Sequence, residues 1–478
     1  MIVTRQLQVF AAQPDYERLR AICEKVGHMR TYLWQRFGGL ATFRQTVGEI
    51  RQDITKDRPF ERLVLDGTVR AENTKDIIND IVAYREAAKR KTAQDIYRRY
   101  PDEQTRRELC GLLKSDAFLK HSYVHRRMRL HFKHGKGKSR RGFVVRSDKF
   151  RIETDAAGMT SVVLHFSRKA GGDIVLTTRV KTDKTPIQNR NLFVRVEDGK
   201  LFIHYAYEKK AKRPFGTGVV AADKGFTEVF ATSSGKFFGE GLGKLIIEYC
   251  ELTTKTNRQR SKLWAYVQKL EENGDFEKAE RIRKNNLGSR KRNSRQKRFE
   301  EKAADLIYKA VHQLVDEGED IVVEDLTAVF QQKKELPAKV KRWLSTWVKG
   351  KIREALDSVA KLRGARVHPV NAAYTSQTDS STSVLSGRRQ GDRFYRESGE
   401  NVHADTNAAR AILLRFYDPE ITLYTPYTEV KAILERRTRE YESEIASGGN
   451  WPSKGSSWMA PVLNGWSNTE CGKKHDQV

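Results

Sequence analysis

The fold of the central part of the chain is decided by residues 218–231, which read GVVAADKGFTEVFA. A small apolar run ends at one carboxylate, Asp223, and an apolar run resumes at Val229. This pattern predicts a buried strand, a bend, and a hairpin that turns at residues 233–235. A carboxylate at the end of a buried strand is costly unless a cation or a proton lies beside it. Asp223 is therefore the first candidate for a functional residue.

The composition of the chain points to a polyanionic partner. The 478 residues carry a net charge of +29, and 32% of them are charged, against about 25% in typical proteins. This surplus favours nucleic acid first and an anionic membrane second. However, no apolar run approaches the roughly 20 residues of a membrane span, and the N-terminus lacks the pattern of a signal peptide. We expect a soluble, intracellular, nucleic-acid-binding protein with no membrane partner.

Two further acids stand in settings like that of Asp223. Glu324 ends an apolar run that begins at Asp320, and Asp405 lies in the first turn of a helix predicted from Val402. The predicted order is strand, hairpin, helix, strand, helix, strand, helix, which is the layout of an RNase H-like mixed sheet covered by helices. In that layout the first strand and a later parallel strand are neighbours, so the acids can converge.

Three converging carboxylates suit hard divalent cations. They can hold two Mg²⁺ ions, or Mn²⁺, roughly 3.5–4 Å apart for phosphodiester hydrolysis. We therefore expect Asp223, Glu324 and Asp405 to be catalytic and to bind the metal. Each also has a simpler interpretation: Asp223 as a turn residue, Glu324 or Asp325 as a helix cap, and Asp405 as a partner of the helix dipole.

The N-terminal half combines helices with a small sheet. Residues 2–10 alternate like a strand, and Asp15 is the expected N-cap of a helix that runs through Leu33. Helical periodicity continues to about residue 125. Residues 142–208 then predict several antiparallel strands, which form a small barrel or sandwich that the N-terminal strand could complete.

A cationic run joins these two parts. Residues 120–141 hold nine Lys or Arg residues, four histidines and no acid, which favours binding of RNA phosphates. A solvated basic loop and a zinc site at His121 and His125 are the alternatives. The candidate nucleic-acid-binding residues of this run are Lys120, Arg126, Arg127, Arg129, Lys133, Lys136, Lys138, Arg140 and Arg141; further candidates are Arg290, Arg292, Arg388 and Arg389.

Three motifs at the candidate acids resemble a known family. The stretches VVAADKGFTEVFATSSG, IVVEDL and HADTNAARAIL resemble the split RuvC motifs of the transposon-encoded TnpB proteins and of the compact type V CRISPR effectors. VHPVNAAYTSQT resembles the stretch that precedes the zinc-binding element of that family. The similarity covers roughly residues 216–415 and implies that Asp223, Glu324 and Asp405 are the catalytic acids.

The resemblance implies a multidomain α+β protein. A helical recognition lobe and a small antiparallel wedge β-barrel precede a RuvC-like mixed α/β domain with a zinc-less insertion. The implied division is 1–12 for the first barrel strand, 13–125 for the recognition lobe, 126–214 for the wedge barrel, 215–370 for the first RuvC-like part, 371–401 for the insertion, 402–435 for the last RuvC-like part, and 436–478 for a disordered tail.

The sequence departs from the family at the zinc ligands. Two CxxC pairs usually lie between the second and third motifs, and here their positions fall on Asp379, Thr382, Tyr395 and Ser398. We therefore expect no zinc. The segment 371–401 is aperiodic and has little apolar material, which predicts a loop or a small insertion. We expect it to be mobile in the free protein. It would be held by packing on the RuvC-like core or by bound nucleic acid, through Arg388, Arg389, Arg393 and Arg396.

The function that the resemblance implies is RNA-guided DNA cleavage. A guide RNA would select double-stranded or single-stranded DNA targets next to a short DNA motif, and the protein would act as a monomer or as a homodimer on one guide RNA. The expected location is the cytoplasm of a prokaryotic cell, at the nucleoid when the protein is bound to DNA. The alternatives are an RNA-guided repressor-like DNA-binding protein with little or no cleavage, and an unguided RNase H-like nuclease or recombinase.

Overall fold

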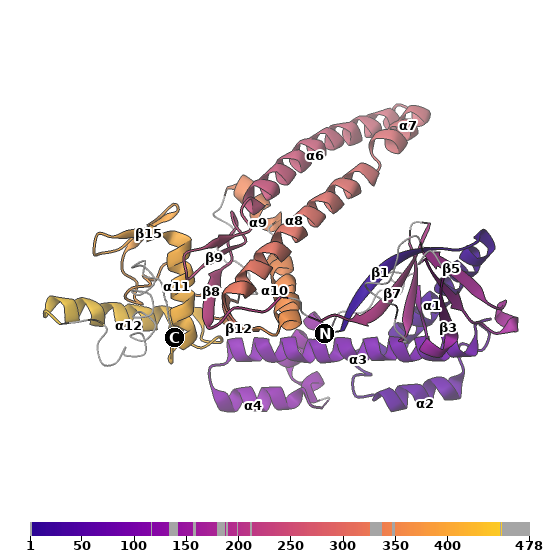
Figure 1. Cartoon of the computed structure of the whole chain (residues 1–478), viewed down its shortest axis with the longest axis horizontal. Coiled ribbons are helices and arrows are strands. Elements are labelled where there is room, and N and C mark those ends of the chain that lie inside the picture. Colours follow the sequence, from indigo (N-terminus) through magenta and orange to yellow (C-terminus); the bar gives the residue numbers. More distant parts are fainter. Residues whose placement is uncertain are drawn as a thin grey trace. The chain divides into compact units, whose positions relative to one another are not determined.

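The chain divides between Lys210 and Ala211 into two units (Figure 1). The computed structural model describes residues 2–115, 117–132, 142–155, 159–178, 187, 190–197, 199–210, 213–325, 337–346, 349–449 and 451. Among these residues, no helix has both the length and the hydropathy that crossing a bilayer requires.

The first unit contains a seven-stranded antiparallel sheet. Its strands, in spatial order, are β2 (Gly142–Val145), β6 (Leu192–Glu197), β7 (Lys200–Glu208), β1 (Ile2–Phe10), β5 (Ile174–Thr178), β4 (Thr160–Leu164) and β3 (Phe150–Thr154). The N-terminal strand β1 lies inside the sheet, because it pairs with β7 from Ile2 to Val9 and with β5 at its end. The sheet curls strongly (Figure 1) but leaves β2 and β3 as edges in the described residues. The expected barrel is therefore a half-barrel.

Helices complete the core of the first unit. They are α1 (Gln13–Phe37), α2 (Val47–Asp57), α3 (Gly67–Arg99), α4 (Glu103–Leu112) and α5 (Ser122–His131). The apolar faces of α1 and α3 share one core with the sheet, including the buried residues Leu19, Met29, Phe143 and Val194. The prediction that Asp15 caps α1 is wrong. The N-cap is Ala12, and Asp15 lies in the first turn, where it accepts a hydrogen bond from Arg18.

The second unit is built on a five-stranded mixed sheet. The spatial order is β10 (Phe237–Phe238), β9 (Phe230–Thr232), β8 (Val219–Asp223), β11 (Asp320–Glu324) and β12 (Arg366–Val370). The hairpin from β9 to β10 is antiparallel, as its turn residues predicted. β11 runs parallel to both β8 and β12. The first strand and a later parallel strand are thus neighbours, as expected.

Helices cover both faces of this sheet. Because side chains alternate along a strand, Val220 and Ala222 of β8 face one core and Ala221 faces another. The first core is formed with α6 (Leu242–Glu272), α8 (Arg290–Glu317) and α10 (Lys349–Arg363), and the second with α11 (Ala404–Tyr417). α6 and α8, joined by α7 (Phe276–Asn286), extend beyond the sheet as a helical arm (Figure 1).

The C-terminal part contains more regular structure than its sequence indicated. Residues 371–401 include β13 (Arg388–Gln390) and β14 (Arg393–Tyr395), which form a three-stranded sheet with β15 (Asn401–His403). Residues 436–446, assigned above to a disordered tail, belong instead to α12 (Tyr427–Ala446). Its apolar residues Val430 and Leu434 are fully buried against Ile421 and neighbours, so packing holds a segment whose sequence is mostly charged.

Candidate active site

Asp223 and Glu324 lie side by side at one edge of the mixed sheet. Each is the last residue of its strand, β8 or β11. The two parallel strands are in register up to Ala222 and Val323, so the next residues are the two acids. Both are nearly inaccessible, with 8% of Asp223 and 6% of Glu324 exposed. The parallel pairing therefore places two carboxylates in a buried setting.

Asp405 joins them from the start of α11. His403 is the N-cap of this helix, and its Nδ1 accepts a hydrogen bond from the Asp405 backbone N–H at 3.3 Å. α11 packs on the sheet through Ile412 and Leu413, which directs its N-terminus to the same edge. The three acids predicted from sequence are thus brought to one place.

The electrostatics of the site reflect the mutual influence of the three carboxylates. The pKa of Asp223 is raised well above its usual value, first by burial and then by the negative charges of Glu324 and Asp405. Burial also raises the pKa of Glu324, although the Thr375 hydroxyl, which donates to Glu324 Oε1, opposes this shift. Such perturbed carboxyl groups are typical of functional sites.

Two cations partly compensate this negative charge. Lys224 Nζ donates a hydrogen bond to the Glu324 backbone oxygen at 2.7 Å, and burial lowers the pKa of this lysine. Arg389 of β13 donates from Nη2 to Asp405 Oδ1 at 2.8 Å. Arg389 was predicted to contact nucleic acid; it lies at the candidate active site.

The donor set has the chemistry of a magnesium site. Carboxylate oxygens are the ligands that hard divalent cations prefer, and a cation would relieve the repulsion that raises the pKa of Asp223. Within the described ranges, however, no three His, Cys, Asp or Glu side chains are gathered closely enough to hold a metal ion. Asp405 is paired with Arg389 instead, so metal binding would require Asp405 to exchange this partner.

Asn407 is a site residue that sequence reasoning missed. It is fully buried on α11, two residues after Asp405. Its side-chain nitrogen donates to the Thr378 backbone oxygen at 2.8 Å, and its side-chain oxygen accepts from the Ser380 N–H at 3.0 Å. Asn407 thereby fastens the insertion to the helix that carries Asp405. The available signal was a polar residue on the otherwise apolar side of that helix.

The insertion is organised by polar contacts at the positions where the resemblance places zinc ligands. Asp379, 2% exposed, accepts hydrogen bonds from the Ser381 N–H and hydroxyl at 2.8 and 2.7 Å. Arg396 Nε lies 3.3 Å from Asp379 Oδ1 and forms an ion pair with it. Thr382 Oγ1 lies 3.0 Å from Ser386 Oγ. The segment is largely irregular, as expected, but it also contains β13 and β14. Its hydrogen bonds supply what its few apolar residues do not.

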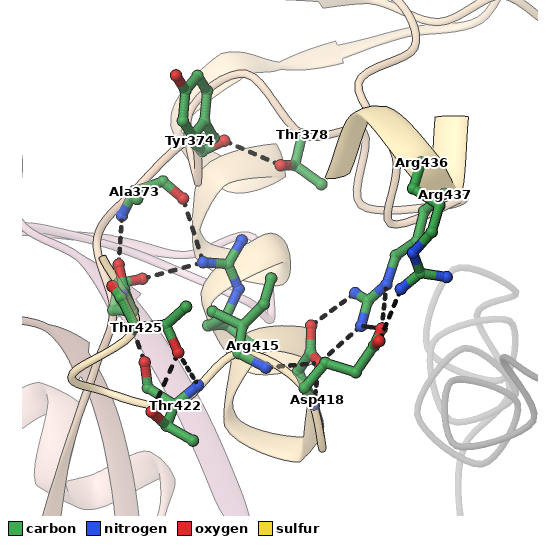
Figure 2. A network of polar contacts seen from close by, with 12 residues as sticks. Ala373, Tyr374, Thr378, Arg415, Asp418, Thr422, Thr425, Arg436 and Arg437 are labelled. Atoms are coloured by element: carbon green, nitrogen blue, oxygen red, sulfur yellow. Dashed lines mark hydrogen bonds and ion pairs between the residues drawn. The ribbon is translucent and has the colours of Figure 1, made fainter. Parts of the chain in front are cut away.

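A network of arginines fastens the insertion and α12 to the end of α11 (Figure 2). Arg415 donates to the Ala373 backbone oxygen at 3.1 Å, and burial lowers its pKa to about 10. Arg437 of α12 forms hydrogen bonds with both oxygens of Asp418, at 2.7 and 2.9 Å. The contacts join the insertion, the end of α11 and α12.

The predicted nucleic-acid-binding residues have different surroundings. Arg127 is bound to Asp95 of α3 at 2.7 Å, and His121 caps α5 by accepting from the Val124 N–H at 3.3 Å. The run 120–141 contains no acid, but the fold brings Asp95 from α3 next to Arg127. The exposed candidates are Lys120, Arg126, Arg129, Arg290, Arg292 and Arg388; Lys133, Lys136, Lys138, Arg140 and Arg141 lie outside the described residues.

These features define a protein that carries three carboxylates at one edge of a mixed sheet and a net charge of +29. Residues 350–412 match the model of a family described as "Cas12f1-like, TNB domain". This stretch contains most of α10, all of β12, the insertion, and the start of α11 with Asp405. The resemblance to compact type V effectors, predicted from the motifs, is confirmed here. The comparison of the sequence with curated proteins finds no match.

Several solved structures are similar to the chain. One is titled "Cryo-EM structure of the Cas12f1-sgRNA-target DNA complex"; the identity is 12%, the match covers 88% of this chain and 99% of that chain, and the TM-score is 0.42. Another is titled "Structure of the mini-RNA-guided endonuclease CRISPR-Cas_phi3", with 14% identity, coverage of 53% and 57%, and a TM-score of 0.31. A third is titled "Crystal structure of AacC2c1-sgRNA binary complex", with 11% identity, coverage of 84% and 71%, and a TM-score of 0.33.

Proposed function

We propose that the protein is an RNA-guided DNA endonuclease that hydrolyses phosphodiester bonds at Asp223, Glu324 and Asp405. The observation that carries this proposal is the convergence of the three acids at one sheet edge, where their mutual repulsion and burial raise the pKa of Asp223. Two Mg²⁺ ions, or Mn²⁺, held by these oxygens would polarise the phosphate and activate water.

The residues of the chain would contribute binding and orientation. Thr375 orients the Glu324 carboxylate through its hydroxyl, and Lys224 holds the end of β11 through the Glu324 backbone oxygen. The guanidinium of Arg389, once released from Asp405, would be placed to bind an anionic phosphate, since Arg suits bidentate phosphate contacts. Asn407 positions the insertion that carries Arg389.

The guided part of the proposal rests on charge and on the family match. A net charge of +29 suits RNA and DNA partners, and residues 350–412 match a family described as Cas12f1-like. In this proposal a guide RNA selects double- or single-stranded DNA by base pairing, and the protein reads a short adjacent motif and the nucleic-acid backbone. The protein would work as a monomer or as a homodimer on one guide RNA.

A cleavage assay tests the chemistry. The protein is purified with its co-purifying RNA, the RNA is sequenced to define the guide, and a matching plasmid is offered with Mg²⁺. Asp223→Asn, Glu324→Gln and Asp405→Asn should each lower cleavage by about 10³-fold or more while DNA binding stays nearly unchanged. The losses should not add, because the three residues act as a unit.

A matched control comes from the same strand. Asp320 begins β11, at the end opposite Glu324, and is bound by Arg366 and His368. Asp320→Asn should therefore cut at nearly the wild-type rate. If any of the three site variants also cuts at that rate, its residue is not part of the catalytic group.

A second candidate is RNA-guided DNA binding without cleavage. One observation favours it: Asp405 is paired with Arg389, and the three acids are not gathered into a metal-binding group in the described residues. In that case the wild-type protein would bind the matching plasmid and leave it intact at every Mg²⁺ or Mn²⁺ concentration. Guided cleavage by the wild type would exclude this candidate.

A further inference from the structure

A basic groove lies between α6 and α9 (Ala338–Thr346) in the second unit, outside the carboxylate site. It encloses a cavity of about 440 Å³. One wall is formed by Lys255, Arg258 and Lys262, which share one face of α6 because they are three and four residues apart. The other wall is formed by Lys339 and Arg342. Five cations thus surround one hollow.

These cations lack acidic partners, with one exception. Lys339 lies 3.2 Å from Glu251 Oε1. In the part of the chain that the structure describes, Lys255, Arg258, Lys262 and Arg342 form no ion pair. Cations concentrated in a concave surface focus a positive potential and attract a polyanion. The groove is therefore short of negative charge.

The floor of the groove is aromatic and fixed in place. The Trp343 ring stacks on Phe226, with ring centres 6.4 Å apart and planes at 23°. Lys339 Nζ lies 5.0 Å from the centre of the Trp343 ring. Cys250 Sγ lies 3.2 Å from Thr346 Oγ1 and ties α6 to α9. A basic groove with an aromatic floor is typical of sites that follow a single nucleic-acid strand.

The groove is connected to the carboxylates. Phe226, which supports Trp343, follows Asp223 by only three residues. Between them, Lys224 reaches the end of β11 through the Glu324 backbone oxygen. Trp343 of the groove therefore contacts the segment that directly follows Asp223 at the end of β8.

We propose that the groove between α6 and α9 binds the phosphodiester backbone of the single DNA strand that is led to Asp223, Glu324 and Asp405. This inference rests on the proposed function. The basic and aromatic lining of the groove suits a single strand. The assignment to DNA follows from the contact of Trp343 with Phe226, three residues after Asp223, at the proposed site of DNA cleavage.

Charge-neutral variants test the groove. Lys255→Gln, Arg258→Gln and Lys262→Gln are combined in one protein. The matched control combines Lys269→Gln, Arg281→Gln and Lys284→Gln, which remove the same charge from exposed positions on α6 and α7. Binding of fluorescein-labelled oligodeoxythymidine to the guide-loaded protein is measured against KCl concentration without Mg²⁺, and the amount of bound guide RNA is measured in parallel.

The groove variant should lose about tenfold or more in DNA affinity at physiological salt. The slope of log affinity against log salt should flatten by about 2, since each lost contact to single-stranded DNA changes it by about 0.7. The groove variant should bind as much guide RNA as the wild type. The control variant should have the DNA affinity and the salt slope of the wild type.

Three results would overturn the assignment: an unchanged slope, an equal loss in the control variant, or loss of guide RNA with DNA binding intact. The first two would show that the groove does not contact DNA, and the third that it contacts RNA. The measurement of oligodeoxythymidine binding does not require cleavage activity. Failure of guided cleavage by the wild type would thus count against the proposed function and leave the groove result standing.

Discussion

At the scale of single residues, the candidate active site contains a carboxylate, Asp223, whose negative charge destabilises the folded state. Asp223 is buried next to two other carboxylates, and its pKa is raised by burial and by their charge. A group whose pKa is raised by folding lowers the stability of the folded state as the pH rises above its unfolded value. At the candidate site, the charged carboxylate that the proposed function needs therefore lowers the stability of the folded state.

The first prediction from this concerns Asp223→Asn, which removes the charge and keeps the shape. At pH 7 the variant should be more stable than the wild type by about 2–4 °C in melting temperature for each kcal/mol gained. The difference should disappear below about pH 4, where Asp223 is protonated in both states. Mg²⁺ should raise the melting temperature of the wild type more than that of the variant. Thermal scans across pH, with and without Mg²⁺, measure all three.

Asp320→Asn is a control that should change the melting temperature in the opposite direction. The Arg366 guanidinium and His368 lower the pKa of Asp320 to about 2, so this carboxylate stabilises the fold in its charged form at neutral pH. Its replacement should lower the melting temperature at pH 7. A loss of stability in Asp223→Asn as well would show that Asp223 is held by favourable contacts and is not a strained carboxylate.

At the scale of elements, the insertion is held by polar contacts among its own residues and with neighbouring elements. Asp379 and Arg396 form a buried ion pair, and Asn407, Thr438 and Trp451 bind the backbone of the same segment. Asn407 binds residues 378 and 380, the Thr438 hydroxyl accepts from the Leu385 N–H at 3.1 Å, and Trp451 Nε1 donates to the Thr382 oxygen at 2.8 Å. We therefore propose that the insertion needs no zinc.

The second prediction tests that proposal. Asp379→Ala leaves the Arg396 guanidinium buried with one partner fewer and should cost on the order of 3 kcal/mol. Faster hydrogen exchange should be confined to residues 375–400. Glu400→Gln, which removes the exposed partner of Arg396, should cost about 1 kcal/mol or less. Near-stoichiometric zinc in elemental analysis, or a lower melting temperature after chelation, would contradict the metal-free fold.

At the scale of the whole molecule, some of the predicted nucleic-acid-binding cations are paired with acids and others are exposed. Arg127 is neutralised by Asp95, which comes from a different helix, whereas Arg126 and Arg129 are exposed on α5. The sequence run 120–141 therefore contains both structural and free cations. Only the free cations are available to phosphate.

The third prediction follows from this difference. Arg126→Gln combined with Arg129→Gln should flatten the salt dependence of RNA binding by about 1.4, because two phosphate contacts to single-stranded RNA are lost. Arg127→Gln should leave the slope unchanged and lower the melting temperature, since Asp95 loses its ion pair with Arg127 and keeps its contact with His131. Filter binding over a range of KCl concentrations measures the slope. A larger change of slope in Arg127→Gln would mean that the pair with Asp95 opens on RNA.

The sequence by itself determined the local elements around the acids and which three acids these elements carry. Apolar runs that end in Asp223 and Glu324 predicted β8 and β11, and the periodicity after Val402 predicted α11 with Asp405 in its first turn. These predictions succeed because strand and helix periods are local properties of the chain. The motifs around the same residues also carried the family resemblance, which the match over residues 350–412 supports.

Only the tertiary structure decided which charges meet. The pairs of Arg389 with Asp405, of Arg127 with Asp95 and of Asp379 with Arg396 join residues 16, 32 and 17 positions apart. No local period encodes such pairs, because they depend on the packing of separate helices and strands. The polar core of the insertion and the burial of α12 were missed for the same reason. Hydrogen bonds and ion pairs between distant segments can hold a fold whose sequence has little apolar material.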